Sequence, residues 1–148
     1  MKITKGVFKM KISTKGRYAL RLLTDLAQHP YKGFVPLKDI AQRQSLSKKY
    51  LEQIVPMLTK SKLLLTNRGY QGGYALSKEP GQYTVGEILK VSEGDIFPVE
   101  DAFDEEEMLK DPTLKMWQGL NKTINDYLYS VTLQDIVDSA ATADDYCI

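Results

Sequence analysis

Residues 37–76 carry the pattern that most constrains the fold, because two short helical segments, a turn and a glycine-rich hairpin follow one another there. Residues 37–44 have apolar positions at helical spacing, and residues 45–47 supply a turn whose serine can cap a second helix over residues 48–55. The chain then becomes extended and closes with a basic hairpin. Helix, turn, helix and hairpin in this order are the parts with which small domains read duplex DNA. The sequence therefore predicts a mainly α fold with a small β wing, a winged helix-turn-helix.

The charge of the chain is divided between its two halves. Residues 1–74 hold fifteen Lys and Arg against three Asp and Glu, a net charge of +12, whereas residues 75–148 hold five against sixteen, a net charge of −11. One interpretation is two solvated faces of opposite sign. A basic half that coincides with a DNA-reading motif is better explained as the surface that faces phosphate. The acidic half would then face a protein partner or solvent.

The single cysteine, Cys147, excludes an internal disulfide and a zinc or iron–sulfur site built from thiolates of this chain alone. The sequence has no nucleophile elbow, phosphate loop or second histidine, so it predicts a protein that is not an enzyme. The one histidine, His29, stands at the expected end of a helix over about residues 14–28, where we expect it to interact with helix-end carbonyls. We predict no cofactor, no metal, no membrane segment and a cytoplasmic location.

The chain is expected to consist of one DNA-binding domain with elements appended at both ends. Residues 10–16 nearly repeat the first residues of the chain, which indicates an N-terminal extension and Met10 as the functional start. The predicted divisions are an N-terminal extension, a winged helix-turn-helix domain, an acidic loop, a dimerisation helix with a terminal helix, and a flexible tail, over residues 1–10, 11–93, 94–111, 112–139 and 140–148.

A capping box marks the start of a helix after the wing. Thr84 and Glu87 have the spacing with which a threonine and a glutamate cap a helix reciprocally, here over residues 85–93. Tyr83 and Ile88 occupy the two hydrophobic-staple positions around that box. The sequence thus gives Tyr83 a packing role at the entry of this helix.

A long helix is predicted from residue 112 to about residue 130, because apolar positions recur there every three or four residues. Such a stripe can cover the domain's own core or pair with the same helix of a second chain. We favour pairing, because small DNA-binding proteins dimerise through late helices of this kind. A second capping box at residues 132–135 starts a short last helix, expected to end near Ser139. The predicted dimer interface consists of Leu114, Trp117, Leu120, Ile124, Tyr127 and Leu128.

The second helix of the motif leaves four polar side chains facing outward, those of Lys48, Lys49, Glu52 and Gln53. The lysines can bind phosphate or base edges, and Gln53 can pair with adenine. Glu52 has two interpretations, which the sequence leaves open: it accepts from a cytosine amino group, or it pairs with a lysine of its own helix. Pro56 should kink this helix after its reading surface, because proline removes a backbone donor.

The tip of the hairpin combines a cation with glycines. Arg68 suits a narrow minor groove, which attracts arginine through its negative potential. Gly69 and Gly72 allow a close approach of the backbone to a sugar–phosphate strand. A glycine-rich hairpin directly after a helix-turn-helix therefore indicates a DNA-contacting wing.

Three motifs, at residues 13–19, 47–53 and 68–74, together resemble those of the Rrf-two family of bacterial winged-helix regulators. The resemblance covers about residues 10–137. It implies a homodimer that pairs through a long crossed helix and binds a palindromic operator in double-stranded DNA, with the second helix in the major groove and the wing arginine in the minor groove. The candidate DNA-binding residues are Lys15, Arg17, Ser47, Lys48, Lys49, Tyr50, Glu52, Gln53, Arg68, Gly69, Gln71 and Gly72.

The chain departs from the family pattern in three places. Members that bind an iron–sulfur cluster carry three cysteines in the loop before the dimer helix, whereas the loop over residues 94–111 has none and is acidic. The resemblance therefore excludes the cluster-sensing branch. Lys62 stands where the family usually has a helix-ending glycine, and Pro56 is unusual at its position. Both leave the path from the second helix to the wing open.

Residues 96–100 and the acidic loop behind them resemble the branch of the family that controls cysteine metabolism, which implies a repressor of cysteine or sulfur genes and cysteine synthase as a partner. Tyr146 and Ile148 form the candidate partner-binding tail, because a free isoleucine carboxylate after acidic residues is similar to the tail that serine acetyltransferase inserts into cysteine synthase. The alternative is an ordinary disordered tail. Two other functions remain open: a sensor of redox or nitrosative stress with Cys147 as a thiol switch, and a protein–protein adaptor that acts through the acidic half.

Overall fold

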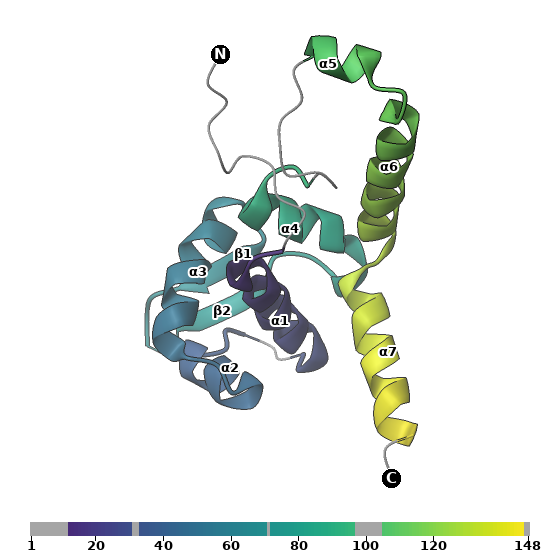
Figure 1. The fold of residues 1–148 in the computed structure, drawn as a ribbon. Coiled ribbons are helices and arrows are strands. Elements are labelled where there is room, and N and C mark those ends of the chain that lie inside the picture. Colours follow the sequence, from purple (N-terminus) through teal and green to yellow (C-terminus); the bar gives the residue numbers. More distant parts are fainter. Residues whose placement is uncertain (1–11, 31–32, 71, 97–104, 147–148) are drawn as a thin grey trace.

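The structure is a computed structural model that describes residues 12–30, 33–70, 72–96 and 105–146, with only the backbone of residues 105, 108 and 143–146. The predictions for residues 1–10, Gln71, Cys147 and Ile148 lie outside this part. The described elements, in chain order, are α1 (Thr14–Gln28), α2 (Leu37–Gln44), α3 (Lys48–Lys60), β1 (Leu64–Asn67), β2 (Gly73–Leu76), the 3-10 turn η1 (Pro80–Gln82), α4 (Val85–Glu93), α5 (Glu105–Lys110), α6 (Leu114–Ser130) and α7 (Leu133–Tyr146) (Figure 1).

Helices α1, α2 and α3 enclose one apolar core, with the two-stranded sheet beside α3 (Figure 1). Each helix contributes its apolar face, as the spacing predicts. The side chains without solvent exposure in this core include Leu22, Leu23, Ile40, Leu51, Leu58, Tyr83 and Leu133. The predicted mainly α fold with a small β wing is therefore confirmed.

Helix α1 begins and ends as the sequence predicts. Ser13 is its N-cap, and the Ser13 hydroxyl accepts a hydrogen bond from the Gly16 amide at 3.1 Å. The glutamate at the end of α4, Glu93, accepts from the Ser13 amide at 3.0 Å and ties the two helices together. At the other end, His29 Nδ1 lies 3.0 Å from the Asp25 carbonyl oxygen, so the histidine serves the helix end as expected.

The expected end of the recognition helix near Val55 is wrong, because α3 continues through Pro56 to Lys60. Proline has no amide hydrogen to donate to the carbonyl four residues earlier. The helix nevertheless persists, since Val55 and Leu58 on either side of Pro56 are buried in the core. Pro56 itself is exposed to solvent.

The path from α3 to the wing is set by a left-handed residue at Lys62, whose φ is 63°. The Leu63 amide donates to the Leu58 carbonyl at 2.9 Å, and the Lys62 amide donates to the Thr59 carbonyl at 3.1 Å. This is the Schellman pattern that normally uses glycine. The lysine therefore adopts the conformation of the glycine that the family pattern expects there.

Helix α4 has the predicted bounds but only half of the predicted capping box. The Thr84 hydroxyl accepts from the Glu87 amide at 3.1 Å. The Glu87 carboxylate does not return to the cap, because Lys78 Nζ holds its two oxygens at 2.9 and 3.0 Å. The box at Thr132 and Asp135 forms completely. The Thr132 amide donates to the Asp135 carboxylate at 2.9 Å, and the Asp135 amide donates to the Thr132 hydroxyl at 3.0 Å.

The C-terminal part holds more helix than the sequence suggested. Residues 105–110 of the expected acidic loop form α5, and α7 runs to Tyr146 instead of ending near Ser139. The extension follows from alanines at 140, 141 and 143, since alanine is the strongest helix former. In Figure 1, α6 projects beside α4 away from the domain, and α7 packs against α1 and η1. None of the helices in the described part is long and apolar enough to cross a membrane.

Candidate DNA-binding surface

The first two turns of α3 present polar side chains on one face and core side chains on the other. Ser47 caps the helix, since its hydroxyl accepts from the Tyr50 amide at 3.2 Å. Leu51 and Ile54 are buried, whereas the four outward side chains predicted from the sequence are all exposed. The folding core therefore fixes which face of α3 is free to meet a ligand.

Glu52 forms the ion pair that was one of its two interpretations. Its Oε1 lies 3.7 Å from Lys48 Nζ, and both side chains are more than half exposed. An exposed pair four residues apart on a helix contributes about 0.3–0.5 kcal/mol, so it gives way readily to a stronger partner. Lys49 and Gln53 have no ion pair or side-chain hydrogen bond within the described residues.

The start of α1 lies beside the start of α3. The rings of Tyr18 and Tyr50 meet edge to face, with 5.3 Å between their centroids and 84° between their planes. Tyr50 is accordingly a half-buried packing residue rather than a fully outward one. Lys15 and Arg17, in the same turn of α1 as Tyr18, are exposed. The contact joins the N-terminal turns of α1 and α3, the two helices that carry these predicted DNA-binding residues.

A buried carboxylate that was not predicted from the sequence fixes the turn of the helix-turn-helix. Asp25 on α1 has no solvent exposure and accepts hydrogen bonds from Arg43 Nη2 at 2.6 Å and Gln44 Nε2 at 2.9 Å. Its hydrogen bond raises the pKa of Arg43 above the usual value. Arg21 also donates to the Gln44 carbonyl. The signal was present, because Asp25 stands on the apolar face of α1, three residues after Leu22.

The wing is a two-stranded antiparallel hairpin that is extended by one bridge to the loop before α2. β1 and β2 pair in the register Leu64 with Leu76 through Asn67 with Gly73. On the other edge of β2, Val35 and Tyr74 exchange hydrogen bonds of 2.8 and 2.9 Å. Strand β2 is thus hydrogen-bonded along both of its edges, and the tip of the hairpin carries Arg68 exposed to solvent.

Two glycines of the wing are required by the fold of the protein itself. A Cβ at Gly72 would lie 2.2 Å from the Asn67 carbonyl oxygen, and one at Gly73, whose φ is 158°, would lie 2.2 Å from the Val35 carbonyl oxygen. The sequence alone suggested a close approach to DNA as the reason for the tip glycines. The structure gives Gly72 a folding reason instead, whereas among the described residues a Cβ at Gly69 would meet only the Asn67 side chain, at 3.4 Å.

Tyr70 is a further wing residue, which was not among the predicted DNA contacts. It lies at the tip between Gly69 and residue 71, and 96% of its surface is exposed. An aromatic side chain held in solvent at the end of a hairpin has no role in the core. Its position in an otherwise polar tip was the sequence signal.

The predicted dimer stripe on α6 is only partly covered by its own chain. Leu128 packs against the cluster of Val85, Leu89 and Ile96, whereas Leu120 and Tyr127 are 38% and 67% exposed. No residue of α6 is buried. Two apolar residues outside the stripe, Met116 and Tyr129, are also exposed.

The start of α6 is fixed by one carboxylate. Asp111 Oδ1 accepts from the amide and the hydroxyl of Thr113 at 2.8 and 2.6 Å, which lowers the pKa of Asp111. The Trp117 indole nitrogen then donates to the Thr113 hydroxyl at 3.1 Å. The indole is therefore oriented at the helix start, on the predicted interface side.

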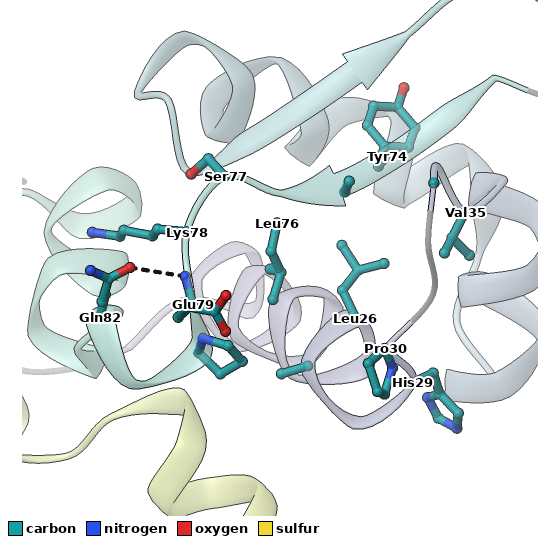
Figure 2. A pocket seen from close by; sticks show the side chains of 14 residues that line it. Leu26, His29, Pro30, Val35, Tyr74, Leu76, Ser77, Lys78, Glu79 and Gln82 are labelled. Carbon is teal, nitrogen blue, oxygen red and sulfur yellow. Dashed lines mark hydrogen bonds between the residues drawn. The ribbon is translucent and has the colours of Figure 1, made fainter.

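A cavity of about 530 Å³ lies between the end of α1, β2 and η1 (Figure 2). Its wall combines apolar side chains such as Leu26 and Leu76 with Lys78 and Glu79. The Glu79 amide donates to Gln82 Oε1 at 3.0 Å, so part of the polar lining is already satisfied. The cavity holds none of the residues predicted to contact DNA.

An iron–sulfur cluster does not fit this chain. The chain has one cysteine, at position 147, whereas such clusters are held mainly by several thiolates. Within the described ranges, no three His, Cys, Asp or Glu side chains gather closely enough to hold a metal ion.

Comparisons with known proteins agree with this geometry. The family described as "Rrf2: Iron-dependent Transcriptional regulator" matches residues 12–139. The transcriptional regulator CymR of Bacillus subtilis is 42% identical over 127 residues, which cover 86% of this chain and 89% of CymR. The solved structure of B. subtilis CymR, the global cysteine regulator, covers 88% of this chain and 98% of its own with a TM-score of 0.73. The structure of T. potens IscR covers 90% of each chain at 41% identity, with a TM-score of 0.71.

Regulators of this family bind DNA and act as dimers. The match spans the helix-turn-helix, the wing and α6, so it includes every element on which the predicted DNA-binding and dimer-interface residues lie. The chain therefore belongs to the Rrf2 family of transcriptional regulators.

Proposed function

We propose that this chain is a homodimeric, cluster-free repressor that binds a palindromic operator in genes of cysteine or sulfur metabolism, in the cytoplasm. The observation that carries the proposal is the capped start of α3, where Lys49 and Gln53 face solvent while Leu51 and Ile54 anchor the helix. This is the arrangement in which a recognition helix enters a major groove. The similarity to CymR supports the cysteine-related signal.

In this proposal the basic half of the chain binds phosphate and the exposed wing reaches the adjacent groove. The charges support it, because two of the three acids among residues 1–74 are already paired, Asp25 with Arg43 and Glu52 with Lys48. Lysine and arginine contacts to phosphate position the protein, whereas Glu52 and Gln53 read base edges. When Glu52 accepts from a cytosine amino group, Lys48 is released toward phosphate.

The dimer forms through the uncovered face of α6. Leu120 and Tyr127 are exposed on a helix of 17 residues that buries none of them within its own chain. An apolar helix face left in solvent marks an interaction surface, and a twofold pairing of this helix gives the symmetry that a palindromic operator requires.

The signal in this proposal is the supply of cysteine, sensed through cysteine synthase. The C-terminal isoleucine carboxylate, Ile148, would occupy the amino-acid site of the synthase. Helix α7 ends at Tyr146, two residues before Ile148. Support for the partner comes from the resemblance and from the CymR relatives, not from a contact in this structure.

A gel-shift experiment on genomic fragments, with and without purified cysteine synthase, tests the function. We expect salt-dependent binding of an operator fragment and a change of affinity when the synthase is added. Removal of the last four residues should abolish the effect of the synthase and leave DNA binding intact. Lys49→Ala should weaken binding, whereas the matched control Lys115→Ala, on α6, should not. An operator affinity that is the same with and without the synthase would refute the cysteine signal. The absence of any DNA binding would refute the proposed function.

A further inference from the structure

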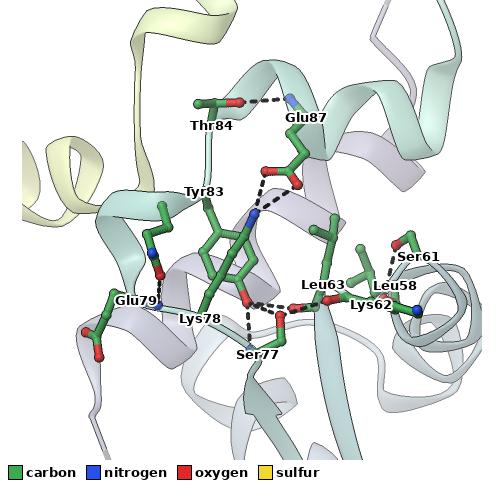
Figure 3. Close-up of polar contacts among 11 residues, drawn as sticks. Leu58, Ser61, Lys62, Leu63, Ser77, Lys78, Glu79, Tyr83, Thr84 and Glu87 are labelled. Carbon is green, nitrogen blue, oxygen red and sulfur yellow. Dashed lines mark hydrogen bonds and ion pairs between the residues drawn. The ribbon is translucent and has the colours of Figure 1, made fainter.

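One buried hydroxyl joins the exit of the recognition helix to the end of the wing. Tyr83 has no solvent exposure, and its hydroxyl donates to the Leu63 carbonyl at 2.7 Å and accepts from the Ser77 amide at 2.8 Å (Figure 3). The Ser77 hydroxyl lies 3.1 Å from the Tyr83 hydroxyl oxygen and donates to the Lys62 carbonyl at 2.7 Å. Lys62 and Leu63 closely follow α3, and Ser77 directly follows β2. The recognition helix α3 and the wing, which are the two DNA-reading elements, are therefore joined at their ends by these hydrogen bonds.

The backbone of the same residue is tied to the connection between α6 and α7. The Leu133 amide donates to the Tyr83 carbonyl at 3.1 Å, and the Val85 amide donates to the Val131 carbonyl at 2.9 Å. Leu133 is fully buried in the core. Tyr83 therefore contacts the start of α7, just after the end of α6, through its backbone, and the segment after α3 through its side chain.

A third contact involves the aromatic ring of Tyr83. Lys78 Nζ lies 4.9 Å from the centroid of the Tyr83 ring and binds both oxygens of Glu87 on α4. This is why the Glu87 carboxylate leaves the capping box (Figure 3). Lys78 therefore lies over the ring, while the hydrogen bonds with Leu63 and Ser77 fix the position of the hydroxyl.

We propose that Tyr83 is a positioning residue, which fixes the recognition helix and the wing relative to the dimer helix and so sets the half-site spacing that the dimer accepts. The inference rests on the proposed function. A dimeric helix-turn-helix protein binds two half-sites about one helical turn apart, so its two reading elements must be held at a defined separation. That separation depends on the joint between each reading element and the dimer axis. The hydrogen bonds of Tyr83 lie at this joint.

The variant Tyr83→Phe removes the hydroxyl and keeps the ring and the backbone bond to Leu133. The matched control is Tyr74→Phe on β2, which removes a hydroxyl that makes no hydrogen bond within the described part of the chain. A second variant, Ser77→Ala, removes the hydroxyl that donates to the Lys62 carbonyl and lies 3.1 Å from the Tyr83 hydroxyl, and it keeps the hydrogen bond from the Ser77 amide to Tyr83. It tests the same joint if Tyr83→Phe does not fold.

The probe is a palindromic duplex recovered by selection of a random DNA pool with the wild-type protein. It is compared with duplexes whose half-sites are one base pair closer or farther apart, and with a duplex of one half-site. We expect Tyr83→Phe to retain the affinity for the single half-site and to lose at least about fivefold of the preference for the selected spacing, the lower end of couplings between sites. Tyr74→Phe should keep the wild-type preference.

Two results would overturn the inference. The first is a spacing preference of Tyr83→Phe that equals that of the wild-type protein. If Tyr83→Phe does not fold, the same result in Ser77→Ala overturns the inference. The second is an equal loss of affinity for the half-site and for all spacings, which shows a residue that only stabilises the domain. If the wild-type protein recovers no duplex, the proposed function fails together with the inference. If it recovers one and the spacing preference is unchanged, the function stands and only the inference fails.

Discussion

Arg43 crosses from the end of α2 to α1 and places its Nη2 2.6 Å from the buried Oδ2 of Asp25. The two partners are unequally exposed, since the Asp25 side chain is fully buried and that of Arg43 is 33% exposed. This asymmetry decides what each substitution costs. Without Arg43, the buried carboxylate keeps the hydrogen bond from Gln44 but loses the guanidinium that balances its charge. Without the carboxylate, the guanidinium can turn to solvent.

We therefore expect Arg43→Ala to lower the free energy of unfolding by about 3 kcal/mol or more, the usual cost of leaving a buried charge unpaired. Asp25→Asn should cost less, about 1–2 kcal/mol, because the amide group that replaces the carboxylate keeps a hydrogen-bonding oxygen for Gln44. Urea unfolding of the two variants measures the difference. An equal cost, or a larger one for Asp25→Asn, would show that the ion pair does not depend on burial of the carboxylate.

Lys62→Gly should stabilise the protein by roughly 0.5 kcal/mol. Glycine removes the steric cost of a side chain on a left-handed backbone, and this gain exceeds the larger backbone entropy that glycine gives the unfolded chain. Lys60→Gly is the control, since Lys60 has ordinary helical geometry and glycine there should destabilise by up to about 1 kcal/mol. Thermal unfolding of both variants gives the signs. A destabilised Lys62→Gly would mean that the lysine side chain contributes more than its backbone costs.

The variants of Arg68 and Tyr70, two exposed residues of the wing tip, should differ in how their DNA affinity depends on salt. Arg68→Ala should weaken operator binding by roughly 1–3 kcal/mol and reduce the slope of affinity against salt, because a cation near phosphate is lost. Tyr70→Ala should weaken binding with an unchanged slope, because only apolar contact is lost. Fluorescence anisotropy over a range of salt concentrations separates them. An unchanged affinity of both variants would exclude the wing tip from the DNA contact.

Leu120→Glu should convert the dimer into a monomer, because it places a charge in the centre of the uncovered face of α6. The control Lys115→Glu also adds a carboxylate to α6, on the opposite side of the helix by its spacing from the stripe. Sedimentation equilibrium gives the molecular mass of each variant, and circular dichroism checks that the domain stays folded. A dimer that survives Leu120→Glu would place the interface elsewhere.

Much of the fold followed from local signals in the sequence. The apolar spacing of α1, the serine cap at Ser47 and the hairpin of the wing all formed as predicted. These features depend on residues close in sequence, for which spacing and capping chemistry are sufficient. The outward face of α3 could be predicted for the same reason.

The features that the sequence did not reveal depend on contacts between distant residues. Glu87 had the spacing of a capping box, but Lys78 from another segment binds it. Tyr83 looked like a staple residue, and only the fold shows its hydroxyl between Leu63 and Ser77. Helix α3 passes Pro56 because burial on both sides outweighs the missing hydrogen bond. Propensity alone does not include such tertiary terms.

Helix α6 buries none of its 17 residues against its own chain, and an isolated helix of that length is only marginally stable in water. Leu128 packs against its own domain, and in the proposed dimer the rest of the stabilisation of α6 comes from a second molecule, which makes the folding equilibrium second order in protein. By mass action, the melting temperature should rise with the concentration of the regulator. The cellular abundance of the protein would thus set both how much of it is folded at α6 and how steeply its operator is filled.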